Sequence, residues 1–325
     1  MPCKKKLLQK NAFIKKSNIL LVYKEISDTK KSQVITEGEI IMTKNILKNK
    51  IDFVAFISVR GANPNGDPNN ENLPRTDDEM YGEMSSGCIH RKIRNRMQDM
   101  GHKIYVQSEE RTDDGYVCLS DRAKALFSEP NNIDKCREEA CEKWLDVRAF
   151  GQVFALPKGN VSFGVRGPVT THEAYSIDPV VIDTYGITKS VNALPPKNET
   201  SMSSDRMGSK SCVKYGLYVL KGAINVQMAR KTGFTEDDAE IVKKALATLF
   251  VNDASAARPE GSMEVVKLYW FKHNNETGQY SSAQVHRSVT AHLKDGCINP
   301  KSIDDYEIVC NELPGLACED VEGTC

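Results

Sequence analysis

The alternation of apolar and polar positions along the chain predicts a mixed α+β protein. Residues 51–60 form a β-branched and aromatic run that is typical of a central strand. Strand patterns recur at 212–227, where apolar residues alternate with polar ones, and at 263–271. Between 161 and 169 the alternation is interrupted by glycines. From 188 to 211 no apolar periodicity is present, which predicts a long loop.

Three segments have the periodicity of helices. Over 86–100 four apolar residues fall on one stripe, and Gly101 follows at the position of a C-terminal cap. A second helix is expected over 133–147, around Trp144. A third begins after Thr235, whose hydroxyl suits an N-cap and is followed by three acidic residues at the positive end of the helix dipole. Once insertions are removed, the order of elements is βαββαβ, the ferredoxin-like (RRM-like) arrangement.

Composition narrows the class of protein. The 325 residues contain no apolar run of the roughly 20 residues that a membrane span needs, and no signal sequence is apparent. The ten cysteines lack a secretory context, so a reducing cytoplasm is expected. The net charge is zero, yet 1–41 is rich in lysine and 301–325 is acidic. Residues 1–41 are interpreted as a disordered basic arm, or as an upstream translation that the natural protein lacks.

The segment 86–100 is the strongest local concentration of positive charge. Four cations lie within six residues and only one acid, Asp99, accompanies them in the helix: Arg91, Lys92, Arg94 and Arg96. Guanidinium groups bind phosphate bidentately and stay charged, so this helix predicts a contact with an anionic polymer. The alternative is a solvated helix face with ion pairs inside the helix.

An Asn/Gly/Pro-rich loop, 61–77, precedes this helix. Asn65-Gly66 followed by Asp67-Pro68 is a strong turn signature, so a structural turn accounts for much of it. A functional interpretation uses exposed backbone N–H groups and Arg75 close to phosphates at the end of the first strand. The glycine spacing of a Walker loop is absent. Whether the loop serves only as a turn or also contacts a partner is left open.

These segments closely resemble the backbone, guide-RNA-binding subunit of the type I-C CRISPR Cascade complex, the Csd/Csh-type backbone family. The likeness spans roughly 42–287 and rests on NPNGDPNNENLPRTD followed by IHRKIRNR, then WLDVRAFG, VRGPV, SIDPV, DRMGSK, YGLYV, GFTEDD and NDASAARPEG. So many blocks in the same order make chance an inadequate explanation.

The resemblance implies a fold shaped like a right hand and a function without catalysis. Its palm would be ferredoxin-like, with a large inserted fingers region and a thumb loop. The divisions are a basic extension (1–41), the first half of the palm with the basic helix (42–101), the fingers (102–160), a palm strand segment (161–187), the thumb loop (188–211), the second half of the palm (212–300) and an acidic tail (301–325). Copies of such a subunit polymerise head to tail along guide CRISPR RNA, with other Cascade subunits at the filament ends, and target DNA pairs with the guide. No cofactor and no membrane partner are implied.

The resemblance also implies which residues contact guide RNA. The four cations of 86–100 are assigned to it by analogy. In the thumb, Met202 and Met207 are candidates to wedge against a displaced base, while Arg206 and Lys210 would hold phosphate. The alternative for these four is an ordinary disordered loop. Tyr215 and Tyr218 lie on a strand, where aromatic side chains could stack on bases, but core packing is expected because alternation places them on opposite faces.

Two rival functions follow from the same residues. Asp67 resembles a loop aspartate with which related type III subunits cleave RNA, so a metal-dependent endoribonuclease is the first rival. No carboxylate–histidine cluster accompanies it, and the cysteines lack zinc-site spacing, so no metal is assigned. The second rival is a protein-interaction scaffold without a nucleic-acid role.

Overall fold

The computed structural model describes residues 45–155, 162–188 and 207–323, and the backbone of four short strands before them. The chain divides into two compact units, 1–46 and 47–325. In the first, β1 (Phe13–Lys16) pairs with β2 (Ile19–Val22), and β3 (Gln33–Thr36) pairs with β4 (Glu39–Met42). The rest of 1–44 lies outside the described residues.

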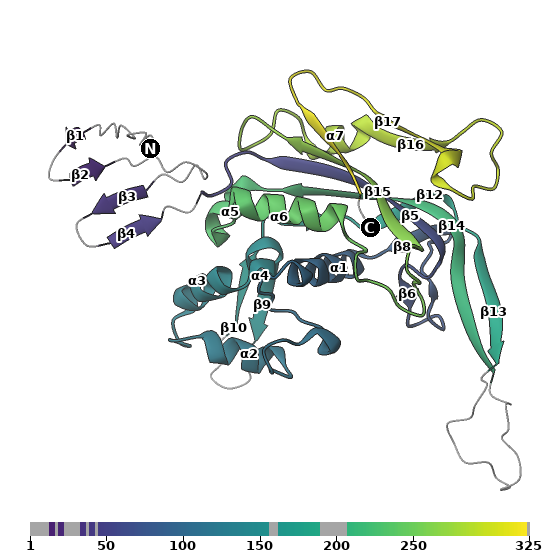
Figure 1. Ribbon diagram of the computed structural model, residues 1–325, viewed down its shortest axis with the longest axis horizontal. Helices are drawn as coiled ribbons and strands as arrows, with labels where there is room; N and C mark the ends of the chain where they lie inside the picture. The colour runs from purple at the N-terminus through teal and green to yellow at the C-terminus, as the bar shows by residue number, and fades with distance from the viewer. Residues whose placement is uncertain are drawn as a thin grey trace, which may run out of the picture. The chain divides into compact units, whose positions relative to one another are not determined.

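An eight-stranded antiparallel sheet forms the centre of the second unit (Figure 1). Its main path runs β18 (Cys318–Glu322), β15 (Met263–Lys272), β5 (Ile51–Ala62), β14 (Met207–Ile224), β12 (Ala174–Pro179) and β8 (Tyr81–Met84). Two further strands pair with β14, β11 (Val169–Thr171) with its end and β13 (Ile182–Thr188) with its start. The predicted α+β class is confirmed.

β5 is the central strand because its first nine residues are all buried, as the apolar run 51–60 predicts. It pairs with β14 on one side and with β15 on the other. Gly222 of β14 lies opposite Phe53. A Cβ atom at Gly222 would collide with the Phe53 ring and lie 2.6 Å from Thr170 O, so only glycine fits there.

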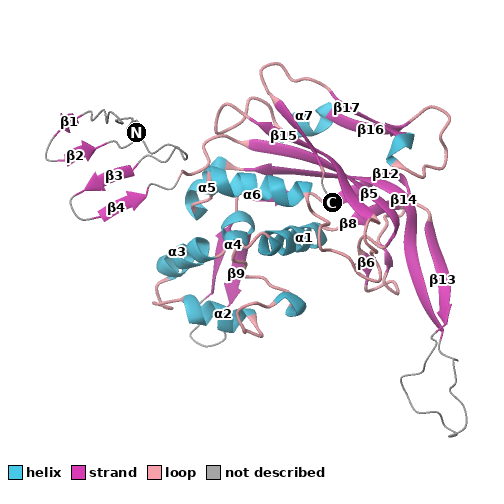
Figure 2. Ribbon diagram, viewed as in Figure 1, coloured by secondary structure: helices cyan, strands magenta, loops and turns pink. Residues whose placement is uncertain are grey.

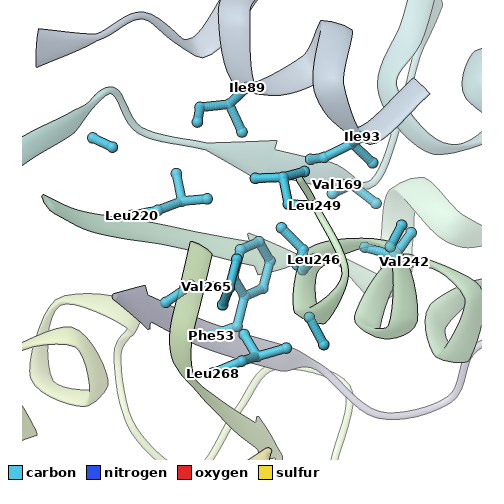
Figure 3. Packing of buried hydrophobic residues seen from close by; sticks show 14 of the residues in the cluster. Phe53, Ile89, Ile93, Val169, Leu220, Val242, Leu246, Leu249, Val265 and Leu268 are labelled. Carbon is cyan, nitrogen blue, oxygen red and sulfur yellow. The ribbon is translucent and has the colours of Figure 1, made fainter. Parts of the chain in front are cut away.

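Two helices cover one face of the sheet, α1 (Ser86–Asp99) and α6 (Glu236–Ala247) (Figure 2). Their apolar stripes meet the sheet in the largest core, drawn in Figure 3, where Ile89 and Leu246 lie with Phe53. The short helix α5 (Val226–Thr232) precedes α6. As predicted, Thr235 caps α6: its hydroxyl accepts from Asp238 N at 3.1 Å, and the Asp238 carboxylate accepts from Thr235 N at 2.8 Å.

The opposite face of the sheet has its own core. α7 (Ser282–Ser288), β16 (Val289–Leu293) and β17 (Tyr306–Cys310) pack over Phe56, Leu217 and Phe271. The acidic segment 301–325, expected as a tail, therefore contains β17, which pairs with β16, and β18, which pairs with β15. Lys267 of β15 contributes to this edge through an ion pair with Asp320 at 3.1 Å.

The segment 102–166 forms a smaller module with a separate aromatic core around Phe154. It contains α2 (Leu119–Leu126), α3 (Ile133–Lys143), α4 (Leu145–Phe150), β9 (Gly151–Ala155) and β10 (Ser162–Arg166). The single helix predicted over 133–147 is wrong. The backbone is extended at Trp144, whose ring packs on Tyr105 with 4.6 Å between centroids, and Leu145 N donates to Lys103 O at 2.9 Å.

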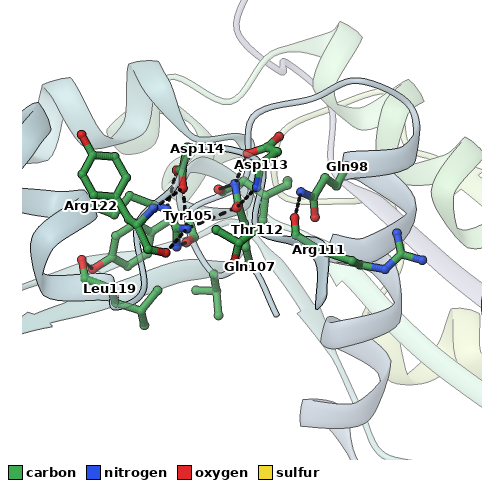
Figure 4. Close-up of polar contacts among 12 residues, drawn as sticks. Gln98, Tyr105, Gln107, Arg111, Thr112, Asp113, Asp114, Leu119 and Arg122 are labelled. Carbon is green, nitrogen blue, oxygen red and sulfur yellow. Dashed lines mark hydrogen bonds and ion pairs between the residues drawn. The ribbon is translucent and has the colours of Figure 1, made fainter. Parts of the chain in front are cut away.

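Polar contacts join this module to α1 (Figure 4). Gln98 Nε2 donates to Arg111 O at 2.6 Å. The buried Arg122 donates to Asp114 through Nε at 2.6 Å and to Tyr105 O through Nη1 at 2.9 Å. The Asp114 pKa is lowered, first by its hydrogen bond from Arg122. These bonds order a segment, 105–122, that has little regular structure of its own.

A buried charged group fastens the start of β5 to the end of β15. Asp52 Oδ2 lies 2.8 Å from His273 Nε2 and 2.9 Å from Lys50 Nζ. His273 Nδ1 accepts from Gln279 N at 2.9 Å, so the ring carries its proton on Nε2 and donates it to Asp52. Burial raises the Asp52 pKa, but hydrogen bonds from His273, Ser282 and Lys50 together lower it by more. The net shift of the pKa is therefore downward.

We expect Asp52→Ala to lower the free energy of unfolding by about 3 kcal/mol at neutral pH, because the buried His273 and the partly buried Lys50 lose their acceptor. Because the folded-state pKa of Asp52 lies below its unfolded value, its stabilisation is present above about pH 4 and is lost as pH falls. Urea unfolding of the wild type and of Asp52→Ala at pH 7 and pH 3 measures this loss of stability. A difference in unfolding free energy between the two proteins that is equal at both pH values would contradict the prediction.

Candidate nucleic-acid interface

The basic helix predicted over 86–100 is present as α1. The Ser85 hydroxyl accepts from Cys88 N at 3.2 Å and caps its start, and Gly101, at φ +85°, follows its end. Ile89, Ile93 and Met97 are buried, as their spacing predicts. The helix therefore lies where the sequence places it, and the surroundings of its four cations can be compared with the expectation.

Lys92 is a core residue, not a surface cation. It is 4% exposed, it forms an ion pair with Asp253, and its Nζ lies 5.3 Å from the centre of the Phe250 ring. Burial lowers the Lys92 pKa, and the charge of Asp253 opposes that shift. Asp253 also accepts from Arg258 Nε at 3.2 Å. The carboxylate thus joins α1 to the loop that precedes β15.

Arg94 binds a carboxylate from another element. Its Nε donates at 2.9 Å to Asp146 of α4, and its guanidinium lies 5.1 Å from the centre of the Phe150 ring. Asp146 is fully buried and also accepts from the backbone N–H groups of Tyr105 and Val106, at 2.7 and 3.1 Å. The pair therefore joins α1, α4 and the backbone of residues 105 and 106.

The two remaining cations also have acceptors. Arg91 Nη1 donates to Val106 O at 2.8 Å, and Arg96 Nε donates to Thr248 Oγ1 at 2.7 Å. The helix contains only one acid, yet each of the four cations has an acceptor from another segment, and Arg91 also donates to Asn95 of the helix itself at 3.4 Å. The assignment of Arg91, Lys92, Arg94 and Arg96 to guide RNA stays a prediction, and this geometry favours a structural role for them.

The loop before α1 folds into a tight turn, as its composition predicts. β6 (Gly66–Asp67) pairs with β7 (Leu73–Pro74), and the intervening Asn72 has a φ of +59°. Asn65 connects the loop to the helix: its Oδ1 accepts from Ser85 N and Ser85 Oγ, both at 2.9 Å. The loop is therefore held against the first turn of α1.

Arg75 also contacts Asn65, the residue that connects the loop to α1. Its backbone N donates to Asn65 O at 2.9 Å, and its Nη2 lies 3.3 Å from Asp67 Oδ1. Its Nε is buried and has no hydrogen-bond partner among the described residues. The first turn of α1 contains no acidic residue, so the positive end of its dipole is not neutralised there. Arg75 and the α1 N-terminus together suit an anion.

The contacts of Asp67 are those of a turn residue. Besides Arg75, its carboxylate accepts from Asn69 N at 3.1 Å. In the ranges that the structure describes, no three His, Cys, Asp or Glu side chains gather as a metal site. None of the helices in these ranges is long and apolar enough to cross a membrane.

A second basic residue beside the loop, Arg258, was not identified from the sequence. It lies in the segment 252–262, where Ala257 O accepts from Asn63 N at 2.9 Å and Ser262 O accepts from Arg60 N at 2.8 Å. The segment therefore contacts both the loop and the end of β5. Its sequence, NDASAARPEG, signalled only a family resemblance, because its partners are far away in the chain.

The long hairpin of β13 and β14 projects from the sheet at the same end (Figure 1). Most of β13 is exposed, with Tyr185 at 45% and Ile187 at 43%. Lys210 pairs opposite Tyr185, so the two side chains share a face of the hairpin. Sequence reasoning missed Tyr185 and Ile187, because an exposed ribbon has no apolar alternation.

The other thumb candidates are only partly described. Met207 is the first residue of β14, paired opposite Thr188. Met202 and Arg206 lie outside the described residues. Residues 207–211, expected in the loop 188–211, are strand because β13 supplies their backbone partners. Tyr215 and Tyr218 are buried in opposite cores of the sheet, so their predicted core role is confirmed.

Comparison with known proteins identifies the family of this chain. No curated protein matches the chain. It is similar to a chain of a "CRISPR RNA-guided surveillance complex, pre-nicking", with 14% identity, a TM-score of 0.43, and coverage of 72% of this chain and 83% of that one. It is also similar to a chain of a "CRISPR RNA-guided surveillance complex", with 14% identity, a TM-score of 0.42, and coverage of 77% of this chain and 78% of that one. The family model of CRISPR-associated protein Cas7 matches residues 49–311, and the chain therefore belongs to that family.

Proposed function

We propose that this protein is a non-catalytic backbone subunit of a CRISPR effector complex and binds guide RNA at the end of the sheet. The observation that carries the proposal is the pairing of Arg75, with a buried Nε lacking a partner in the described structure, with the acid-free first turn of α1. Asn65 holds both together, and Arg258 lies on the adjoining segment. Phosphate is the anion that these donors suit.

Finer features of the function are part of the same proposal. The complex is of the type I-C Cascade kind, located in the cytoplasm, where copies polymerise head to tail along the guide, present it to target DNA and contact other subunits at the filament ends. The ferredoxin-like palm corresponds to β5, α1, β12, β14, α6 and β15, the module 102–166 to the fingers and the β13–β14 hairpin to the thumb. Support comes from this order of elements and from the family.

We expect Arg75→Glu to reduce the RNA that copurifies when the protein is expressed with a CRISPR repeat array. The lost phosphate contact should also lower the salt slope of RNA binding by about one unit. The measurements are the absorbance ratio of the purified protein and RNA titrations across a salt series. Arg287→Glu is the matched control, because Arg287 is exposed on α7, over the other face of the sheet.

Two outcomes would contradict the proposal. Wild-type protein that purifies without RNA would favour a scaffold with no nucleic-acid role. Metal-dependent cleavage of complementary RNA that disappears in Asp67→Ala would establish the endoribonuclease instead. The bonds of Asp67 to Asn69 and Arg75 argue against that alternative, because they occupy the carboxylate in the turn.

A further inference from the structure

A basic hollow lies between the module 102–166 and α5, apart from the interface at the end of the sheet. Its volume is about 310 Å³. It is lined by residues of α3, β10 and α5, among them Arg137, Gly164, Arg166, Met228, Lys231 and Thr232. The lining contains three cations and no acidic residue. Such a charge surplus on a protein with zero net charge is local and selects for an anionic ligand.

The three cations are held differently. Arg137 is fixed, because its Nε donates to Gly164 O at 3.3 Å and its Nη1 lies 3.0 Å from Asp134, while Nη2 has no partner in the described residues. Arg166 ends β10 and Lys231 lies in the last turn of α5. Both are exposed and have no ion pair within the described structure. They are therefore free to bind a ligand.

A purely structural role does not account for this arrangement. A cation at the end of α5 does complement the helix dipole. The neighbouring Arg230 serves that end as well and has its own partner, Glu276, whereas Lys231 faces the hollow. Arg166 has no such explanation, because the residue opposite it on β9 is Gly151.

The shape of the hollow restricts the ligand further. No aromatic side chain lines it, so it offers no surface on which a base could stack. A Cβ atom at Gly164 would meet nothing within 4 Å, so the surface there is open. An open, acid-free site with guanidinium and ammonium donors suits the phosphate of a polymer better than an enclosed nucleotide.

We propose that this hollow binds a phosphodiester of a nucleic-acid strand, as a second contact besides the interface at the end of the sheet. The proposal deepens the function proposed above and rests on it. The strand is either the guide or the DNA paired with it, and both supply the same phosphate chemistry.

The test replaces Arg166 and Lys231 together by glutamine. The probe is a fluorescein-labelled single-stranded DNA oligonucleotide, titrated across a salt series into the purified protein and into the protein carrying guide RNA. We expect affinity to fall about tenfold and the salt slope to fall by about 0.7 units, the change for one lost phosphate contact on a single strand. Arg287→Gln with Lys301→Gln makes the same change of charge at exposed positions outside the hollow.

A second variant removes no charge. Gly164→Leu should fill the hollow and weaken binding of the same probe, and an unchanged urea midpoint would show that the fold is intact.

The RNA that copurifies with the double variant identifies the strand. A lower RNA content than that of the wild type assigns the site to the guide, and an unchanged content assigns it to the paired strand. An affinity and slope equal to those of the control pair would overturn the proposal. A wild-type protein that carries no RNA would refute the proposed function alone, since the oligonucleotide titration still decides this site.

Discussion

Asp146→Ala is expected to lower the free energy of unfolding by about 4 kcal/mol. Asp146 is fully buried and accepts three hydrogen bonds, from Arg94 Nε and from the backbone of Tyr105 and Val106. Alanine would leave a largely buried guanidinium and two backbone donors without acceptors, and removing one partner of a buried pair costs about 3–5 kcal/mol. Urea unfolding, followed by circular dichroism, measures the loss.

The matched control is Asp121→Ala, which removes a carboxylate from the same module. Asp121 pairs with Lys124 at 3.0 Å, and both side chains are about half exposed. An exposed pair of this kind contributes little, so the midpoint should stay close to that of the wild type. Equal midpoints for the two variants would show that the Arg94–Asp146 pair does not hold the module on α1.

The contrast between these aspartates shows what the sequence alone could predict. The stripe of Ile89, Ile93 and Met97 and the caps around it were sufficient to place α1. The partners of its cations were not predictable from periodicity, because Asp146 is 52 residues from Arg94 and Asp253 is 161 residues from Lys92. Counting the charges along one helix identifies only the acids within that helix and misses those that the fold brings to it.

Edge and projecting strands were the least predictable part of the fold. β18, with the sequence CEDVE, is largely exposed and lacks apolar alternation, and it is a strand because β15 offers backbone partners at the sheet edge. β13 is also largely exposed, and it is a strand because β14 supplies its backbone partners on one side. The apolar, β-branched composition of a central strand such as β5 predicts that it is buried, whereas the composition of β13 and β18 gives no such signal.

The proposed sites depend on residues that only the fold brings together. Arg75 and Arg258 are far apart in the sequence, and contacts of Asn65, Asn63 and Ala257 place their segments side by side. The hollow likewise collects Arg137, Arg166 and Lys231 from three elements. Neither set forms a motif along the chain, so neither could be found before the structure.

Shortening the β13–β14 hairpin is expected to weaken guide RNA binding about 100-fold while leaving the fold intact. Thr188 and Met207 are cross-strand partners, so an Asn-Gly turn can replace residues 189–206 without changing the register. As the proposed thumb, the hairpin would lose Met202 and Arg206, its candidate base and phosphate contacts, and a hydrogen bond to a charged group contributes about 1.5–3 kcal/mol. Filter binding with guide RNA and size-exclusion chromatography measure affinity and assembly.

The β9–β10 hairpin provides a control of the same design. Ala155 and Ser162 are also cross-strand partners, so the same turn can replace residues 156–161. That change shortens a hairpin of the module 102–166 and should leave RNA affinity unchanged. Because Tyr185 and Lys210 remain in the shortened thumb, Lys210→Glu in the full-length hairpin tests their share separately. Assembly on RNA that survives removal of 189–206 would mean that the tip of this hairpin is not needed to hold the guide.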